Sequence, residues 1–147
     1  MMPTSADQLG MWRPIGPRIV AIVVGLCLLV VCTATWWTIG AENRAEFSFF
    51  QKSTLVALGL GIFGCLWALG RSKVEAYADR LVIINGFRRR ELAWAQVISV
   101  NLPAGAPWVT LDLSDGDVVS AMGIQGSDGR SSVDAVRTLR ALVQENS

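Results

Sequence analysis

The chain has 147 residues, 52% of them hydrophobic and 17% charged, with a formal net charge of +1 at pH 7. Its mean hydropathy of +0.42 exceeds what a single soluble core of this size needs, which indicates a membrane protein. The chain has no histidine, so it lacks the commonest general base and the usual catalytic triads. Because residues 72–147 have no basic excess, nucleic acid is not expected as a partner. We therefore expect no enzymatic activity and no cofactor.

Residues 1–18 contain three prolines and scattered polar groups without any periodicity. This composition predicts a flexible N-terminal lead with no independent role, in which Trp12 would lie at the membrane interface.

Two uncharged apolar segments follow, at residues 19–39 and 53–70. At about 1.5 Å rise per residue, a helix over the first segment crosses a hydrocarbon layer of roughly 30 Å, and the second just reaches that length. The sequence thus predicts a transmembrane helical hairpin over residues 19–71. One alternative is a pair of buried helices in a soluble protein, although little chain remains to surround them. The other is a cleaved signal peptide, in which Arg13 and Arg18 would precede the apolar core.

The distribution of lysine and arginine predicts the orientation of this hairpin. Five cations flank its outer ends, whereas only Arg44 and Lys52 lie between the two segments. The five are Arg13, Arg18, Arg71, Lys73 and Arg80. We therefore expect a multi-pass protein of the cell membrane with both termini in the cytoplasm.

Small residues recur along one side of the second segment. Ala57, Gly61 and Cys65 are spaced by four, with Gly64 and Ala68 beside them, and such a stripe allows a second helix to approach closely. Packing within the hairpin, with Gly25 facing the stripe, is the favoured interpretation. Docking against a helix of another membrane protein, or self-association, is the alternative.

Beyond Ser72 the pattern changes to short apolar runs broken by turn residues, which marks a second domain over residues 72–147. We expect Asn85-Gly86 to form a tight hairpin turn, and Ser114 to Asp117 to join a second hairpin. Six antiparallel strands are expected, at 74–78, 81–84, 87–93, 97–102, 108–113 and 118–124.

A final amphipathic helix is expected from Ser131, acting as a cap, to about Gln144. Its apolar face would comprise Val133, Val136, Leu139, Leu142 and Val143. The fold class is therefore a membrane helical hairpin plus an α+β or mainly β domain. The domain would be a bent antiparallel sheet or a partly open barrel with the helix at one end.

Several polar and aromatic residues of this domain are candidate contacts. Arg88, Arg89 and Arg90 form the one basic run, which anionic lipid headgroups would attract, although strand alternation prevents all three from sharing one face. Trp94 is expected in the core, while the role of Trp108 as a binding aromatic is left open. Four aspartates match no calcium loop and are interpreted as turn residues: Asp112, Asp115, Asp117 and Asp128.

The order of these motifs carries a resemblance. The stretch from Val74 to Val143 is similar to bacterial pleckstrin-homology (PH)-like domains in its Ala78-Asp79-Arg80-Leu81 segment, Asn85-Gly86 turn, Trp94, Pro107-Trp108 and Ser114-Asp115-Gly116. With two apolar segments in front, the chain resembles short actinobacterial membrane proteins that contain a PH domain. The resemblance implies a PH-like fold and no particular activity.

Two functions are weighed on these observations. The first is a membrane-anchored binding or scaffolding module, whose cytoplasmic domain or hairpin engages another membrane protein, as an accessory subunit of a larger complex. The second is recognition of anionic lipid headgroups through Arg88, Arg89 and Arg90.

Overall fold

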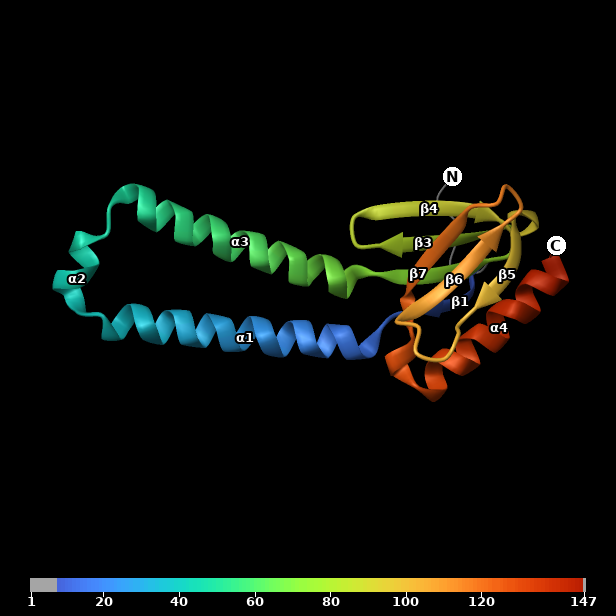
Figure 1. The fold of residues 1–147 in the computed structure, drawn as a ribbon, viewed down its shortest axis with the longest axis horizontal. Coiled ribbons are helices and arrows are strands. Elements are labelled where there is room, and N and C mark those ends of the chain that lie inside the picture. Colours follow the sequence, from blue (N-terminus) through green and yellow to red (C-terminus); the bar gives the residue numbers. More distant parts are fainter. Residues whose placement is uncertain (1–7, 147) are drawn as a thin grey trace. The chain divides into compact units, whose positions relative to one another are not determined.

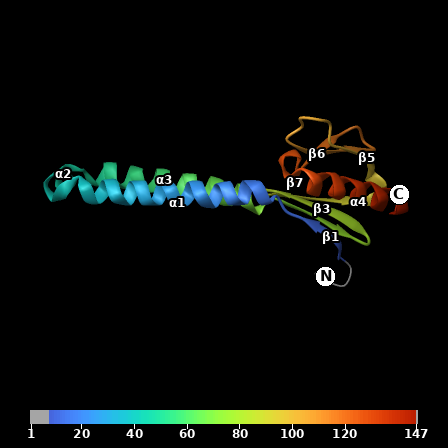
Figure 2. The same ribbon diagram turned by 90° about the horizontal axis from the view of Figure 1, so that it is seen from below.

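A computed structural model describes residues 8–146 and divides into two compact units. One unit contains the chain as far as Gly16 together with everything from Arg71 onward, and the other contains Pro17–Gly70. Figures 1 and 2 show a helical segment and a domain of sheets. Each unit is described separately below.

The helical unit contains two long apolar helices and a short one between them. These are α1 (Ile15–Thr38), α2 (Gly40–Glu46) and α3 (Phe49–Arg71). Both α1 and α3 are long and apolar enough to cross a membrane, and they coincide with the two expected segments. No residue of either helix is buried, whereas the core helix of a soluble protein would be mostly buried.

The second unit contains two antiparallel sheets and a C-terminal helix. One sheet has the order β1-β2-β3-β4, with β1 (Gln8–Trp12), β2 (Lys73–Tyr77), β3 (Arg80–Asn85) and β4 (Arg88–Ala93). The other has the order β5-β6-β7, with β5 (Val97–Asn101), β6 (Trp108–Leu113) and β7 (Val118–Gln125). Short 3-10 turns, η2 (Trp94–Gln96) and η3 (Gly126–Asp128), precede β5 and α4 (Arg130–Asn146) (Figure 1). The expected fold class is confirmed.

The strand β1 corrects the expectation of a flexible lead. It pairs antiparallel with β2, placing Trp12 opposite Val74, and Trp12 packs against the hydrophobic core. The helical unit is therefore an insertion between two neighbouring strands of one sheet. The five-residue segment QLGMW has no local partner, so periodicity alone did not reveal it. The expectation for residues 1–7 lies outside the described residues.

The core lies between the two sheets and α4, because alternate residues of each strand point inward. Val74, Leu81 and Ile83 from the first sheet and Val109 and Leu111 from the second are at most 1% exposed. Trp94, at 3% exposed, joins this core, and its Nε1 donates a hydrogen bond to the carbonyl of Tyr77 at 2.9 Å. The expected core position of Trp94 is confirmed.

Asn85 joins the two sheets. Its Nδ2 donates to the carbonyl of Ser120 at 2.6 Å, and its Oδ1 accepts from the amide of Met122 at 3.0 Å. Asn85 itself stays in β3, so the expected Asn85-Gly86 turn is shifted by one residue. The two turn residues are Gly86 and Phe87, and Gly86 adopts a φ of 60°, as the first position of a type II′ turn requires.

The α4 helix differs from its expected form at both ends. It begins at Arg130 and ends at Asn146, so Ser131 lies inside the first turn and does not precede the helix. Val133 is 54% exposed and does not belong to the buried face, which is displaced around the helix. That face consists of Ser132, Ala135, Val136, Leu139 and Val143.

The packing of β1 predicts that Trp12→Ala destabilises the domain. Loss of a partly buried indole should lower the free energy of unfolding by about 2 kcal/mol, measured on the full chain by urea titration in mild detergent. Trp37→Ala is the matched control, since Trp37 is 71% exposed in α1 and its loss should change that free energy by less than about 0.5 kcal/mol. Equal effects of the two substitutions would mean that β1 contributes nothing to the domain.

The bridge between the sheets predicts a second stability effect. Asn85→Ala removes two hydrogen bonds to β7 and leaves the Met122 amide without this partner, so unfolding should become easier by about 2 kcal/mol. Asn146→Ala serves as control, because Asn146 bonds only the neighbouring turn at the exposed end of α4. Matching urea midpoints for wild type and Asn85→Ala would contradict a bridging role.

Candidate functional site

Three surfaces of the described chain offer contacts to a partner: one face of α3, the basic start of β4, and a groove beside α4. Among residues 8–146, no group of three or more His, Cys, Asp or Glu side chains is arranged to hold a metal ion.

The small-residue face of α3 is not filled within the helical unit. A Cβ built on Gly61 or Gly64 would meet no atom within 4 Å, whereas one on Gly25 of α1 would meet Leu66 Cδ1 at 3.6 Å. Leu66 therefore lies on the side of α3 that is nearest Gly25 of α1. The space beside Gly61 and Gly64 is thus open within the helical unit, although Gly64 and Ala68 are themselves half-buried. Which helix packs on the face of Ala57, Gly61, Gly64, Cys65 and Ala68 stays a prediction.

The three arginines of β4 are exposed but differ in their partners. Arg89 Nη2 lies 2.6 Å from Glu91 Oε1, and Arg90 Nη2 lies 3.3 Å from Asp117 Oδ2. Arg88 follows the turn directly and opposes Asn85 in the ladder. Exposed ion pairs contribute only about 0–1 kcal/mol to stability, yet they reduce the charge available to an anionic ligand. The run is therefore not a uniform basic patch.

A polar cluster lies on β2 near these arginines. Lys73 Nζ is 2.6 Å from Glu75 Oε1, and the Tyr77 hydroxyl donates to Glu75 Oε2 at 3.4 Å. Burial, reinforced by the Glu75 carboxylate, raises the pKa of Tyr77 above its usual value, although Arg89 and Arg80 act in the opposite direction. Tyr77 is therefore a neutral hydrogen-bond donor to Glu75 at physiological pH.

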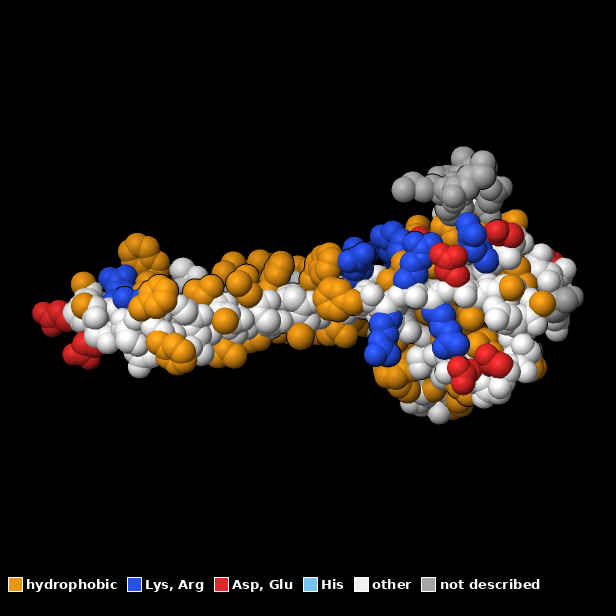
Figure 3. Space-filling model, turned by 90° about the horizontal axis from the view of Figure 1, so that it is seen from above, with side chains coloured by type: hydrophobic (Ala, Val, Ile, Leu, Met, Phe, Trp, Pro, Cys, Tyr) orange, Lys and Arg blue, Asp and Glu red, His pale blue; other side chains and the backbone are white. Residues whose placement is uncertain are grey.

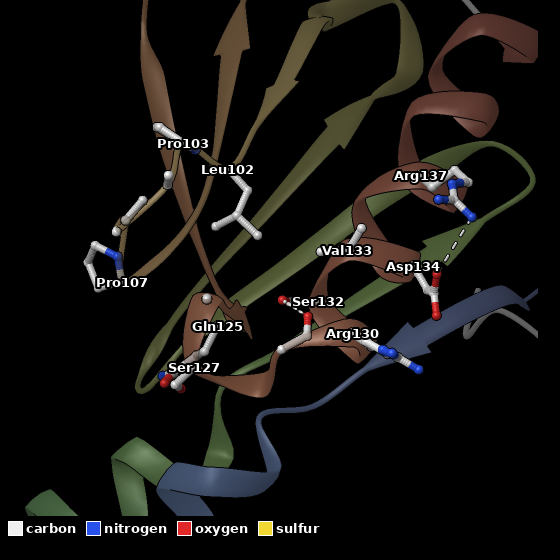
Figure 4. A pocket seen from close by; sticks show the side chains of 15 residues that line it. Leu102, Pro103, Pro107, Gln125, Ser127, Arg130, Ser132, Val133, Asp134 and Arg137 are labelled. Carbon is white, nitrogen blue, oxygen red and sulfur yellow. Dashed lines mark hydrogen bonds and ion pairs between the residues drawn. The ribbon is translucent and has the colours of Figure 1, made fainter.

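An open groove of about 900 Å³ separates the β5–β6 connection from the start of α4. Leu102 and the loop as far as Pro107 form one side, and Val133, Asp134 and Arg137 of α4 form the other (Figure 4). Arg137 Nη1 lies 3.7 Å from Asp134 Oδ1. This groove was not predicted from the sequence. Its one signal there is the loop from Pro103 to Pro107, which has no side chain larger than proline, because the exposure of Val133 follows only from the fold.

The groove depends on one glycine. A Cβ added to Gly126 would lie 2.3 Å from the carbonyl oxygen of Ala106, so only glycine allows η3 to approach this loop. Trp108 begins β6 opposite Gln125 and is half-buried outside the groove lining. It belongs to a different sheet from Arg88, Arg89 and Arg90.

Comparison with known proteins bears on the domain. A model of the family described as "Bacterial PH domain" matches residues 71–142. A bacterial PH domain, with two apolar helices before it, is therefore present in this chain. No curated protein and no solved structure matched the chain.

Proposed function

We propose that this bacterial PH domain is a membrane-held binding module, and that α3 docks its small-residue face against a helix of another membrane protein or a second copy of the chain. The observation that carries the proposal is the open space at Gly61 and Gly64. PH domains are generally binding modules without catalytic activity, which supports the same class of function. The chain would act as an accessory subunit or scaffold.

The chemistry of α3 suits such docking. Apolar side chains gain little from leaving lipid for a protein interface, so helices in a bilayer associate mainly by close packing. Glycine and alanine permit the two backbones to approach, and the face from Ala57 to Ala68 extends over three helical turns. A partner helix could therefore run along about half of α3.

The pairing of β1 with β2 supports a hairpin topology. Residues before α1 and after α3 belong to one sheet, so they lie on the same side of any membrane that the two helices cross. The five outer cations against two in the connection favour the cytoplasm for that side. We accordingly propose a multi-pass protein of the cell membrane with both termini in the cytoplasm. Membership of the actinobacterial group stays a prediction from the sequence.

Headgroup recognition by Arg88, Arg89 and Arg90 together is the second candidate. It receives less support, since Arg89 and Arg90 are already paired with Glu91 and Asp117. Of the three, Arg88 is the best candidate for a lipid contact.

A bulky residue in the small face should block docking. Gly61→Leu keeps the segment apolar but fills the open space, so association in membranes should weaken by about tenfold, equivalent to ~1.4 kcal/mol. The measurement is the yield of crosslinked adduct formed by the full chain in its native membrane, resolved by mass into a second copy or another protein.

Gly59→Leu is the matched control for this experiment. Gly59 lies opposite Gly61, on the side of α3 that Leu66 marks as nearest α1, and a Cβ there also meets no atom within 4 Å. Leucine at this position therefore adds the same bulk away from the small face, so the adduct should persist. A chain that forms no adduct, or an adduct equally tolerant of both leucines, would count against docking through this face.

Reporter fusions test the orientation. A fluorescent protein joined to the C-terminus should fluoresce and alkaline phosphatase at the same place should be inactive, because the fused end lies in the cytoplasm. Phosphatase inserted in the connection at α2 should be active. The reverse pattern would overturn the cytoplasmic placement of the domain.

A further inference from the structure

The groove beside α4 has one wall whose backbone is fixed. In the β5–β6 connection, the amide of Ala106 donates to the carbonyl of Pro103 at 3.0 Å, and Gly105 has the φ of 82° that a type II turn requires. The amide of Gly126 donates to the carbonyl of Pro107, also at 3.0 Å, and this bond holds the other end of the loop. A ligand would therefore find this wall already formed, so that little conformational entropy is lost on binding.

The middle of the groove is apolar. Leu102 packs against the hydrophobic core, and Val133 of α4 is 54% exposed. Their side chains point toward one another across the groove (Figure 4). A second hollow of about 490 Å³ shares Leu102, Val133 and Arg137 with the first, and continues along α4 as far as Gln144. The groove thus offers an elongated site in which an apolar side chain of a ligand could cover Leu102 and Val133.

The α4 wall of the groove is basic. Arg130, Arg137 and Arg140 are exposed and line one or both hollows. Their spacing of seven and three residues places them along one side of the helix. Among the described residues, Asp134 is the only acidic one in this lining. Three cations therefore accompany a single carboxylate.

Most of this charge is uncompensated. Arg130 has no hydrogen-bond or ion-pair partner among residues 8–146. Arg137 and Asp134 are 3.7 Å apart, but their side chains are 80% and 69% exposed, and a pair this open to water is weak. Arg140 Nε donates to the carbonyl of Val100 at 2.9 Å, which positions its guanidinium without neutralising it.

The arginines of β4 differ in this respect. Arg89 is paired with Glu91, and Arg90 with Asp117. Figure 3 likewise shows acidic side chains beside basic ones on one face of the domain. The groove beside α4 therefore combines available positive charge with an apolar centre, whereas the arginine run of β4 does not.

We propose that this groove binds an extended acidic peptide segment of a partner protein. Carboxylates of the segment form charge-assisted hydrogen bonds with Arg130, Arg137 and Arg140, and one apolar side chain covers Leu102 and Val133. A simple anion has no group for the apolar centre, and the length of the groove along α4 suits a chain better than a compact ligand. The inference goes beyond the proposed function, because it concerns the PH domain and does not require docking through α3.

Selection from random peptides tests the proposal without a known partner. Phage that display random heptapeptides are first depleted on empty phosphatidylcholine nanodiscs. They are then selected on discs of the same neutral lipid that hold one copy of the full chain. Enriched peptides should contain several Asp or Glu residues around an apolar one. Their affinities are measured by fluorescence anisotropy, and should fall as salt is raised, because screening weakens the attraction to the arginines.

Val133→Asp should lower the affinity of these peptides by about tenfold, because it removes an apolar contact and adds a like charge. Val118→Asp is the matched control, since Val118 is 61% exposed and lies outside the lining of both hollows. Arg130→Gln should lower the affinity by about threefold and reduce its salt dependence. Lys52→Gln, which removes an exposed cation of α3, should change neither.

Each other outcome would overturn the proposal. Enrichment of no peptide, or of neutral or basic ones, would exclude an acidic segment as the ligand, and equal loss with both valine substitutions would exclude the groove. Inorganic phosphate that displaces peptides with and without the apolar residue equally well would indicate a simple anion site. Weaker binding per chain in discs with two copies would assign the groove to a second copy. Single-copy discs contain no helix partner, so none of the results obtained with them depends on α3.

Discussion

The ladder between β1 and β2 is the constraint on which the architecture depends. Trp12 and Val74 are opposite each other although the whole helical unit lies between them in the sequence. The ladder hydrogen bonds and the packing of Trp12 make the domain discontinuous, with an apolar insertion between adjacent strands. The two ends of the helical unit are therefore joined to two neighbouring strands of one sheet.

A second close contact gives the sheets their arrangement. Asn85 bonds both a carbonyl and an amide of β7, and a Cβ on Gly123 of β7 would lie 2.6 Å from the backbone of Lys73. The sheets thus approach closely at this point for two reasons. Asn85 of β3 bonds to β7, and Gly123 of β7 has no side chain that would collide with β2. Because Lys73 begins β2, the approach occurs close to the chain connection.

Much of this fold could be predicted from local patterns. Continuous apolar segments predicted α1 and α3, alternation and turn residues predicted the strands from β2 to β7, and three-and-four spacing predicted α4. The misses share a physical cause, since each depends on contacts distant in sequence. Strand β1 needs β2 as its partner, and the position of Val133 depends on which face of α4 meets β5 and β7. Residue type alone does not encode these contacts.

The candidate surfaces were harder to predict than the fold. The run of three arginines was evident in the sequence. Its pairing with Asp117, which partly neutralises the charge of Arg90 and not that of Arg88, depends on a contact between the two sheets. Conversely, the two sides of the groove beside α4 come from segments that are distant in sequence, so they are brought together only by the fold. Small residues on α3 were recognised directly, but only the structure showed that α1 leaves Gly61 open.

The insertion also sets an order of events during synthesis. β1 leaves the ribosome before α1 and α3, and must wait for β2 before it can form its ladder. Closing a flexible loop of about 60 residues costs roughly 3–4 kcal/mol in entropy, whereas a helical hairpin brings its ends together beforehand. If only one helix inserted, β1 and β2 would be left on opposite sides of the bilayer and the sheet would lack its edge strand. Under the proposed topology, completion of this domain would therefore require that both helices cross the bilayer, and an unfinished copy would expose the open edge of β2.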